Sequence, residues 1–591
     1  MRTTIKVCIS LLMVVLVFTS CDLFSNNNTP TPTPAPNPVP QSVTLSYNSL
    51  QTTPHNGGKY YPIQSGTTEV IITDLPQGNS VNLVRINTTK NDMSGLATVA
   101  ANEYSGTSHS ALDNYKTELA CIENDPASYN SVGYTETPDK PFEIPFIDTT
   151  DYAKLEREYK EKYSSRIVEP DRMVSGGQSF SLGNTKTFEV DDVDFGIHAT
   201  LRAVGEHCYV WVSDGEIVDE EGNYSNTGKY VNYDSTVYGE SETIPNNDNR
   251  ITLAQAEDLA RAFDSLYEIE VALIGNSYTT NPDSTYFINP QAKVSILVYD
   301  IEGDYSNTQS GGTFGMFWGG DLYNASVQQG SNQMELLYVD SYFTDIVFTS
   351  VISTVAHEFE HMLYFVNKWM GQRVTTGETW YTEMGAMMAE DCLATYLNNQ
   401  YRNFVISIDS TLGRLNDFNL LYFSGGLGYW GSGNAVLTSY AISGIFGCWL
   451  QRNYGGKDLI RYLVNNDASN EASITKAINS CGSRDTFKDA FRKFALSFTQ
   501  PDAIAFTLNK ARAGNANGNY ELVAADPWSE PYKNTIKGKN LYGPLYVPGD
   551  YTGCMRGYGF WLTGWDSSEC TGIKLTLSAV TGEENYIVIT E

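Results

Sequence analysis

One helical pattern, over residues 344–368, constrains the fold more than any other part of this 591-residue chain. Its centre reads His-Glu-Phe-Glu-His at residues 357–361, the pattern HExxH, with apolar residues on both sides. Residues four apart lie on one face of a helix, so His357 and His361 can point at one metal ion. Two histidines and two glutamates inside an apolar helix need partners, because burying unpaired polar groups is costly. The pattern therefore predicts a buried helix that carries a metal site, rather than a helix with two surface histidines.

The residue types of this motif fit zinc chemistry. Two neutral imidazoles and a carboxylate are typical zinc ligands, and a fourth position stays open for water. Glu358 directly follows the first imidazole, so it can reach a water bound to the metal. We therefore expect one catalytic Zn²⁺, bound by His357, His361 and a third ligand.

The third ligand is predicted to be a carboxylate, because the chain has six histidines and none follows His361. The longer pattern HExxHxxGxxH is absent, since Tyr364 and Asn367 occupy its glycine and third histidine positions. The downstream candidates are Glu378, Glu383, Glu390 and Asp391.

Glu383 is the favoured ligand among these four. It lies near the middle of an apolar helical pattern over residues 377–399, whereas Glu378 lies at its start, where an acidic residue simply favours the helix dipole. Glu390 is seven residues further along the same face, so it can hold a ligand histidine in place. An ordinary exposed glutamate is the alternative for Glu390.

The charge balance narrows the possible partners. Lys and Arg number 38 against 69 Asp and Glu, which gives a formal net charge of −31. A chain this acidic is a poor candidate for binding nucleic acid or an anionic membrane surface. Acidic loops such as residues 219–222 could bind Ca²⁺, but they lack the EF-hand spacing. Calcium is therefore possible but unsupported.

The first residues predict export. A basic start precedes a mostly apolar run over residues 7–18, which is too short to span a bilayer as a mature helix. Small residues before Cys21 resemble a lipobox, so residues 1–20 are a predicted lipoprotein signal peptide and Cys21 a predicted lipidation site. An ordinary signal peptide with a chance cysteine is the alternative. The Pro/Thr-rich residues 21–41 predict an extended tether, so we expect an exported, membrane-anchored lipoprotein on the cell surface or periplasmic face.

Several patterns outside the motif predict elements of an α+β protein. Thr252 and Gln255 form a predicted capping box that opens a helix. Residues 294–299 and 334–339 indicate buried strands, and further helical patterns cover 436–453 and 473–498. Changes in composition then predict a domain order: an N-terminal β domain, a linker or short helix, a β region, the catalytic unit and a C-terminal β domain, at residues 42–150, 151–175, 176–245, 246–505 and 515–591.

The HExxH motif and Trp380-Tyr-Thr-Glu383 on the next helix together resemble the gluzincin clan. The fuller run, which ends in Met388-Ala-Glu-Asp391, is similar to the hyicolysin family of bacterial metallopeptidases over about residues 178–500. The family usually has glycine directly after the ligand glutamate, but here Met384 stands there and Gly385 follows. The resemblance implies a thermolysin-like catalytic domain, with an antiparallel or mixed sheet and active-site helices, flanked by all-β modules. It also implies zinc-dependent hydrolysis of peptide bonds, with Glu358 as the general base that takes a proton from the attacking water.

The resemblance suggests an oxyanion donor and a substrate strand as well. The spacing from Tyr440 to Gly455-Gly456 is similar to the tyrosine helix of gluzincin aminopeptidases, so the Tyr440 phenol is the candidate donor. Residues 312–320 would be the edge strand that aligns a peptide by main-chain pairing. A glycine-rich surface loop is the alternative for this segment. The predicted substrate-binding residues are Thr313, Phe314, Gly315 and Met316.

Three functions remain in order of preference. The first is a zinc endopeptidase that acts on protein or peptide substrates. The second is an aminopeptidase, which would need an acidic site such as a G-x-M-E-N-type strand, whereas Phe317 and Trp318 follow Gly315-Met316 here. The third is a surface-binding lipoprotein that keeps the fold without activity, and the intact histidines, Glu358 and downstream glutamate argue against it.

Overall fold

The protein is described by a computed structural model with side chains. The chain divides into two units, residues 1–40 and 41–591, and the first lies outside the described residues together with the predicted signal peptide and Cys21. The described residues are 41–52, 58–101, 142–143, 146–163, 179–236, 249–278, 282–309, 311–400, 426–431, 435–499, 534–536, 539–541, 552–566, 571–578, 580 and 582–590.

A six-stranded mixed sheet forms the base of the part of the chain that is predicted to be catalytic, called the catalytic part below. Its three central strands are parallel, and antiparallel strands flank them on both sides. The three strands of this sheet that come first along the chain lie within the predicted β region 176–245, so this region is part of the catalytic sheet. The order across the sheet is β15 (Gly315–Phe317), β16 (Leu336–Asp340), β13 (Val294–Tyr299), β10 (Cys208–Glu216), β9 (Ile197–Val204) and β8 (Thr185–Phe188).

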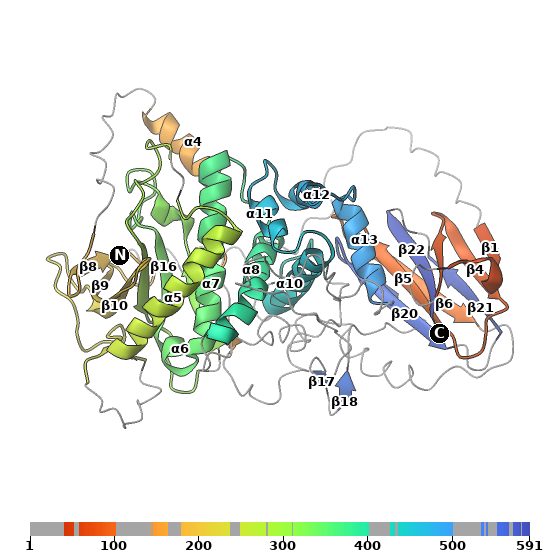
Figure 1. The fold of residues 1–591 in the computed structure, drawn as a ribbon, viewed down its shortest axis with the longest axis horizontal. Helices are drawn as coiled ribbons and strands as arrows, with labels where there is room; N and C mark the ends of the chain where they lie inside the picture. Colours follow the sequence, from red (N-terminus) through yellow and green to blue (C-terminus); the bar gives the residue numbers. More distant parts are fainter. Residues whose placement is uncertain are drawn as a thin grey trace, which may run out of the picture. The chain divides into compact units, whose positions relative to one another are not determined.

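Helices cover one face of this sheet. The helix α5 (Leu253–Leu273) packs on β9 and β10, and its predicted capping box is confirmed, because Thr252 and Gln255 exchange hydrogen bonds. The helix α7 (Phe348–Tyr364) packs against α5 on one side and against α8 (Thr379–Gln400) on the other (Figure 1). A π-helical turn, η4 (Phe365–Met370), continues α7.

A second helical layer follows α8 along the chain. The helix α10 (Ala435–Asn453) packs along α8, and three shorter helices complete the layer. The helical pattern over residues 473–498 corresponds to two of these shorter helices, at Asn470–Ser480 and Phe487–Ser497, rather than to one helix. The remaining described elements are α6 (Ser341–Ile346), α11 (Asp458–Val464), α12 (Asn470–Ser480), α13 (Phe487–Ser497), η1 (Tyr47–Ser49), η2 (Ile301–Gly303), η3 (Gly319–Leu322), β7 (Phe142–Glu143), β11 (Tyr233–Asp234), β12 (Ile251–Thr252), β14 (Gly311–Gly312), β17 (Asn534–Ile536) and β18 (Lys539–Leu541).

Two five-stranded sheets form a β sandwich from both ends of the described chain. Apolar residues from the two sheets, among them Val70, Leu83, Leu575 and Ile587, share one buried core. The first sheet has the order β1 (Gln41–Ser46), β4 (Thr67–Thr73), β21 (Gly572–Leu577), β6 (Met93–Ala101) and β19 (Thr552–Met555). The second has the order β2 (Gln51–Thr52), β3 (Lys59–Ile63), β22 (Glu583–Thr590), β5 (Ser80–Asn87) and β20 (Phe560–Asp566).

The strand order differs from the expectation of separate β domains at 42–150 and 515–591. The strand β21 lies between β4 and β6, and β22 lies between β3 and β5, so these two C-terminal strands fill positions between N-terminal strands, while β19 and β20 lie at sheet edges. Alternating apolar residues predict which face of a strand is buried, but they do not select its neighbours. The two ranges therefore build one module.

The helix α4 (Tyr152–Tyr163) lies within the range predicted as the linker 151–175. It packs on the catalytic part, because the buried Tyr152 ring stacks on Tyr323 with centroids 5.4 Å apart. Glu156 is also buried, and it accepts a hydrogen bond from the Tyr323 hydroxyl at 3.1 Å. Most residues of α4 are charged, so its composition is that of a solvated segment. Composition alone therefore does not predict that a few buried residues attach this helix to the catalytic part.

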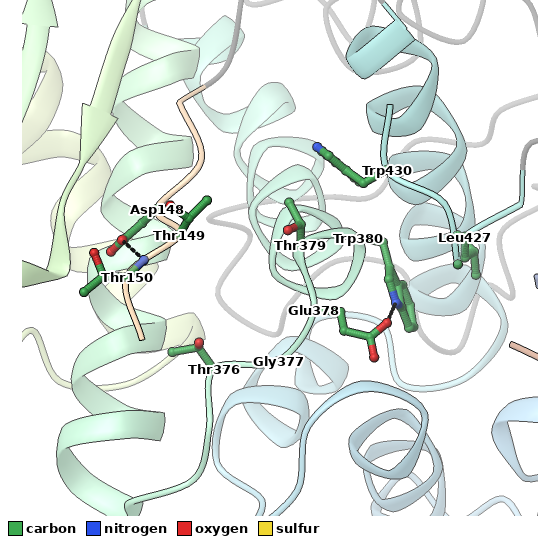
Figure 2. A pocket seen from close by; sticks show the side chains of 11 residues that line it. Asp148, Thr149, Thr150, Thr376, Gly377, Glu378, Thr379, Trp380, Leu427 and Trp430 are labelled. Carbon is green, nitrogen blue, oxygen red and sulfur yellow. Dashed lines mark hydrogen bonds between the residues drawn. The ribbon is translucent and has the colours of Figure 1, made fainter. Parts of the chain in front are cut away.

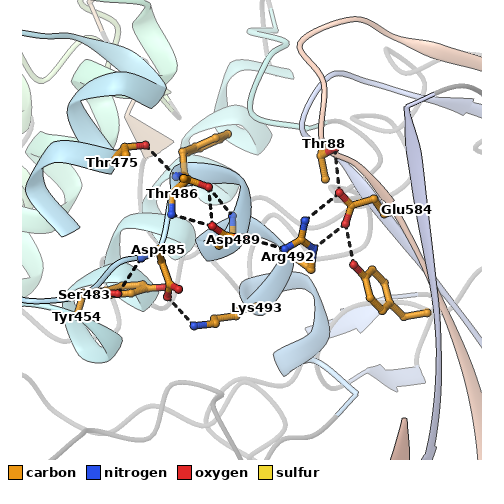
Figure 3. A network of polar contacts seen from close by, with 12 residues as sticks. Thr88, Tyr454, Thr475, Ser483, Asp485, Thr486, Asp489, Arg492, Lys493 and Glu584 are labelled. Carbon is orange, nitrogen blue, oxygen red and sulfur yellow. Dashed lines mark hydrogen bonds and ion pairs between the residues drawn. The ribbon is translucent and has the colours of Figure 1, made fainter. Parts of the chain in front are cut away.

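Polar and aromatic contacts join the sandwich to the catalytic part. Arg492 of α13 donates two hydrogen bonds to the Glu584 carboxylate of β22, at 2.6 and 2.9 Å (Figure 3). The Tyr586 hydroxyl donates to the same carboxylate at 2.7 Å. Beside this network, Phe498 stacks on Phe560 of β20 with centroids 5.5 Å apart. The α13 helix thus covers the outer face of the second sheet.

Candidate metal centre and cleft

Two adjacent helices bring the predicted ligands together. The α7 helix carries His357 and His361 one turn apart, and α8 carries Glu383 opposite them. The Glu383 Oε2 atom lies 3.0 Å from His357 Nε2 and 3.3 Å from His361 Nε2. One ligand atom from each residue lies within 4.8 Å of the others, and among the described residues this is the one such group of three His, Cys, Asp or Glu side chains.

The distances from the Glu383 oxygen to the two histidine nitrogens fit a tetrahedral zinc ion. Zinc–nitrogen and zinc–oxygen bonds of about 2.1 Å at tetrahedral angles place the ligand atoms roughly 3.4 Å apart. The two separations from Glu383 are close to that value. The donor set also has the right chemistry, because two imidazole nitrogens and one carboxylate oxygen leave a fourth position for water or substrate.

Glu390 lies where a residue that orients His357 is expected. Its Oε1 atom is 2.8 Å from His357 Nδ1, while its Oε2 atom accepts a hydrogen bond from Ser353 Oγ at 2.5 Å. Burial alone lowers the pKa of His357, but the hydrogen bonds to Glu383 and Glu390 outweigh burial and raise this pKa well above its ordinary value. A carboxylate on Nδ1 fixes the ring and leaves Nε2 for a metal.

Glu360 is a site residue that the sequence reasoning missed. Its carboxylate is fully buried and lies 3.5 Å from His361 Nδ1. Burial raises the pKa of Glu360 to about 7, although the neighbouring His361 lowers it. Gly385 makes room for this carboxylate, because a Cβ atom at Gly385 would lie 2.9 Å from Glu360 Oε1. Gly385, which stands one position later than the glycine of the family pattern, is thus explained by the space that Glu360 needs.

Glu358 faces the edge strand of the sheet. The Phe317 amide of β15 donates a hydrogen bond to Glu358 Oε2 at 2.8 Å, and the side chain is buried. The strand can approach α7 this closely because residue 315 is glycine. A Cβ atom at Gly315 would lie 2.9 Å from the Thr354 Cγ2 atom of α7.

Only two of the four predicted substrate-binding residues belong to a strand. Gly315 and Met316 belong to β15, which pairs with β16 and forms the edge of the sheet. Met316 packs against the core on the sheet face opposite α7, and Phe314 is buried against Phe343. Thr313 lies between β14 and β15, outside both strands. Main-chain atoms, rather than these side chains, are therefore available to align a peptide.

Tyr440 lies beside the proposed metal site. Its ring centroid is 6.0 Å from that of His357, and α10 carries it. The side chain is buried against Met387 and Val436. This position is compatible with the predicted role as an oxyanion donor.

The two other acidic candidates are engaged elsewhere. Glu378 accepts a hydrogen bond from Trp380 Nε1 at 3.1 Å and forms an ion pair with Lys90 of the sandwich. Asp391 forms a buried, bidentate ion pair with Arg452 of α10. Neither belongs to the ligand group. The acidic loop at residues 219–222 closes on Asn223, whose amide donates to Asp219, and it gathers no such ligand group among the described residues.

A cleft beside the metal ligands has two connected parts. A cavity of about 90 Å³ reaches His361 and Glu383, and a wider one of about 360 Å³ adjoins it. Figure 2 shows residues 148–150 on one side of the wider cavity and Thr376 to Trp380 opposite them. Asp148, Thr150, Thr376, Gly377 and Thr379 line both parts. The segment 146–150 was expected in the N-terminal β domain, and no motif in it signals a place in the cleft.

The fold and the site define a class of protein, an HExxH metallopeptidase with a candidate third metal ligand on the following helix. Residues 234–544 match the family Peptidase M30, and the chain belongs to this family. The neutral metalloprotease ShpI of Staphylococcus hyicus is 27% identical over 240 residues, which are 39% of this chain and 50% of that protein. The chain thus spans about half the length of this relative. The resemblance to the hyicolysin family is confirmed.

No helix in the described part of the chain is long and apolar enough to cross a membrane.

Proposed function

We propose that this chain is a zinc-dependent endopeptidase that hydrolyses peptide bonds of protein substrates. The observation that carries the proposal is the meeting of His357, His361 and Glu383 around one point, with Glu358 on the same helix facing the edge strand. The metalloprotease relative and the family membership support the reaction class.

Each residue has a distinct task in this proposal. His357, His361 and Glu383 would hold Zn²⁺, which supplies a Lewis acid for the scissile carbonyl. Glu358, oriented by the Phe317 amide, takes a proton from the attacking water and passes it to the leaving amine. The Tyr440 hydroxyl donates to the oxyanion that develops on the carbonyl oxygen. The outer main-chain edge of β15 aligns the substrate.

The experiment that tests this proposal compares the wild type with Glu358→Gln. Purified protein should bind one zinc ion in both forms, but only the wild type should cleave a protein substrate such as casein. Glu257→Gln is the matched control, because Glu257 is an exposed glutamate on α5. Full activity of Glu358→Gln, or the absence of zinc binding, would refute the proposal.

The products of cleavage separate an endopeptidase from an aminopeptidase. Mass spectrometry of an N-terminally blocked peptide should show internal cuts if the enzyme is an endopeptidase. Loss of single N-terminal residues from a free peptide, with the blocked peptide intact, would favour the aminopeptidase. A surface-binding protein without activity would cut neither peptide.

We further propose that Cys21 is lipidated and that residues 21–41 tether the enzyme to a membrane after export. The support is the apolar run that ends in small residues before Cys21, followed by the Pro/Thr-rich stretch. Cys21→Ser should release the enzyme from the membrane fraction and abolish labelling by a fatty-acid analogue. Membrane retention and labelling that are unchanged in this variant would exclude the anchor.

A further inference from the structure

A short segment of the chain follows the edge strand along the cleft. We call residues 142–143 together with 146–150 the strap. The β7 backbone, at Phe142 and Glu143, pairs in parallel with β14 at Gly311 and Gly312. Further along, Asp148 Oδ2 accepts a hydrogen bond from the Gly319 amide at 3.3 Å. The strap therefore accompanies the glycine-rich segment from residue 311 to residue 319.

The strap also reaches the opposite wall of the cleft. Ile147 packs against the cluster that contains Tyr440 and Met387, which lies beside His357. Strap residues line the cavity at the candidate metal ligands together with His361 and Glu383. The strap thus extends from the edge strand to the α10 side, along the cavity that these proposed ligands share.

The helix α4 anchors one end of the strap. The Tyr152 hydroxyl donates to the Asp148 carboxylate, and the Tyr152 ring is buried between Tyr323 and Phe365. The strap itself is held more weakly. Its described side chains are half-buried or exposed, and the bonds to Gly319 and from Trp318 Nε1 to Thr150 measure 3.3 and 3.4 Å.

We propose that the strap occupies the groove in which a substrate strand binds and holds the enzyme in a latent form. This inference rests on the proposed peptidase function. A substrate that aligns on β15 needs the same space beside the metal ligands, so it must displace the strap first. Weak fastening at the strap and strong anchoring at α4 allow the segment to leave the groove while it stays attached to the enzyme.

The first test loosens the strap at Asp148. Asp148→Ala removes the acceptor for both the Gly319 amide and the Tyr152 hydroxyl. It should lower KM and raise kcat/KM for a peptide substrate roughly tenfold, because the bond from the Gly319 amide, which ties the strap to the glycine-rich segment, is one hydrogen bond to a charged group. The Tyr152 bond joins the strap to its own anchor. Asp194→Ala is the matched control, because Asp194 is exposed and lines neither cavity. A fall in activity, or equal values in both variants, would overturn the proposal.

A binding experiment separates the strap from the reaction. Fluorescently labelled oxidised insulin B chain is titrated into zinc-loaded Glu358→Gln, with and without Asp148→Ala. The double variant should bind the probe roughly tenfold more tightly, whether or not the wild type hydrolyses it. Equal or weaker binding would overturn the strap proposal even if hydrolysis is demonstrated. Absence of hydrolysis in the wild type and in Asp148→Ala, with tighter binding in the double variant, would refute the proposed function alone.

A synthetic peptide of residues 142–150 gives an independent measurement. It should compete with the labelled probe on the double variant, because the groove is then open to a second copy of the strap. It should compete less well on Glu358→Gln alone, where the strap of the chain already fills the groove. No competition on either protein would overturn the proposal.

Discussion

Replacing Glu390 with glutamine should weaken zinc binding without unfolding the protein. The Glu390 carboxylate lies 2.8 Å from His357 Nδ1, and both side chains are almost fully buried. Such a charge-assisted bond fixes the ring and increases the basicity of its other nitrogen. Glutamine keeps a neutral acceptor, so we expect about a tenfold loss of zinc affinity, near 1.4 kcal/mol. Alanine removes the acceptor and should approach a hundredfold loss.

Competition with a chromophoric zinc chelator at fixed pH measures these affinities directly. Glu335→Gln is the control, because Glu335 is also buried but accepts its hydrogen bond from the Gln291 amide, away from the ligands. Its zinc affinity should equal that of the wild type. Affinities of Glu390→Gln and Glu390→Ala within twofold of the wild type, with native circular dichroism, would refute the assigned role of Glu390.

Three further predictions concern pH, the oxyanion and the sandwich. Burial raises the pKa of Glu335 to about 8, so the folded protein holds a proton there that the unfolded chain releases near its ordinary pKa. The free energy of unfolding of the wild type should therefore fall as the pH rises from about 5 to 8. Glu335→Gln lacks this carboxyl, so its free energy of unfolding, measured with urea, should exceed that of the wild type by an amount that grows to a few kcal/mol across this pH range. A difference that stays constant with pH would contradict this prediction. Tyr440→Phe should lower kcat roughly 100-fold with unchanged zinc affinity, because an oxyanion donor is lost; unchanged turnover would remove that role. Glu584→Gln should destabilise the docked sandwich by about 1 kcal/mol, since its bidentate bond with Arg492 is partly exposed. Asp467→Asn, in the exposed pair with Lys476, is the control and should change the urea midpoint little.

Local patterns in the sequence predict the elements of the catalytic part well. The strand over residues 294–299 and the helix that Thr252 opens are found where expected, because burial periodicity and capping are properties of neighbouring residues. The helices that carry His357 and Glu383 also begin and end within four residues of their predicted limits. Helix geometry then dictates which side chains share a face.

Features that depend on distant neighbours are not encoded in such patterns. Nothing in the alternation of residues 572–577 shows that β21 pairs with β4 and β6. The place of the strap is not predicted by its sequence either. Its backbone pairing with β14 and the bond from the Gly319 amide to Asp148 use main-chain groups and a carboxylate that many other segments also contain. Glu360 was visible as part of the motif, but its contact with His361 depends on the room that Gly385 leaves on another helix.

The interleaved strands of the sandwich determine when this module can form. Arg85 and Glu583, which form a fully buried ion pair, are 498 residues apart. During synthesis, β3, β4, β5 and β6 emerge long before the strands that fill the gaps between them. Until then each carries unpaired edges, which invite pairing with other chains. The strands β21 and β22 thus act as the closing step of folding, and a chain that lacks these two strands would expose four strand edges, on β3, β4, β5 and β6, beside an otherwise assembled enzyme.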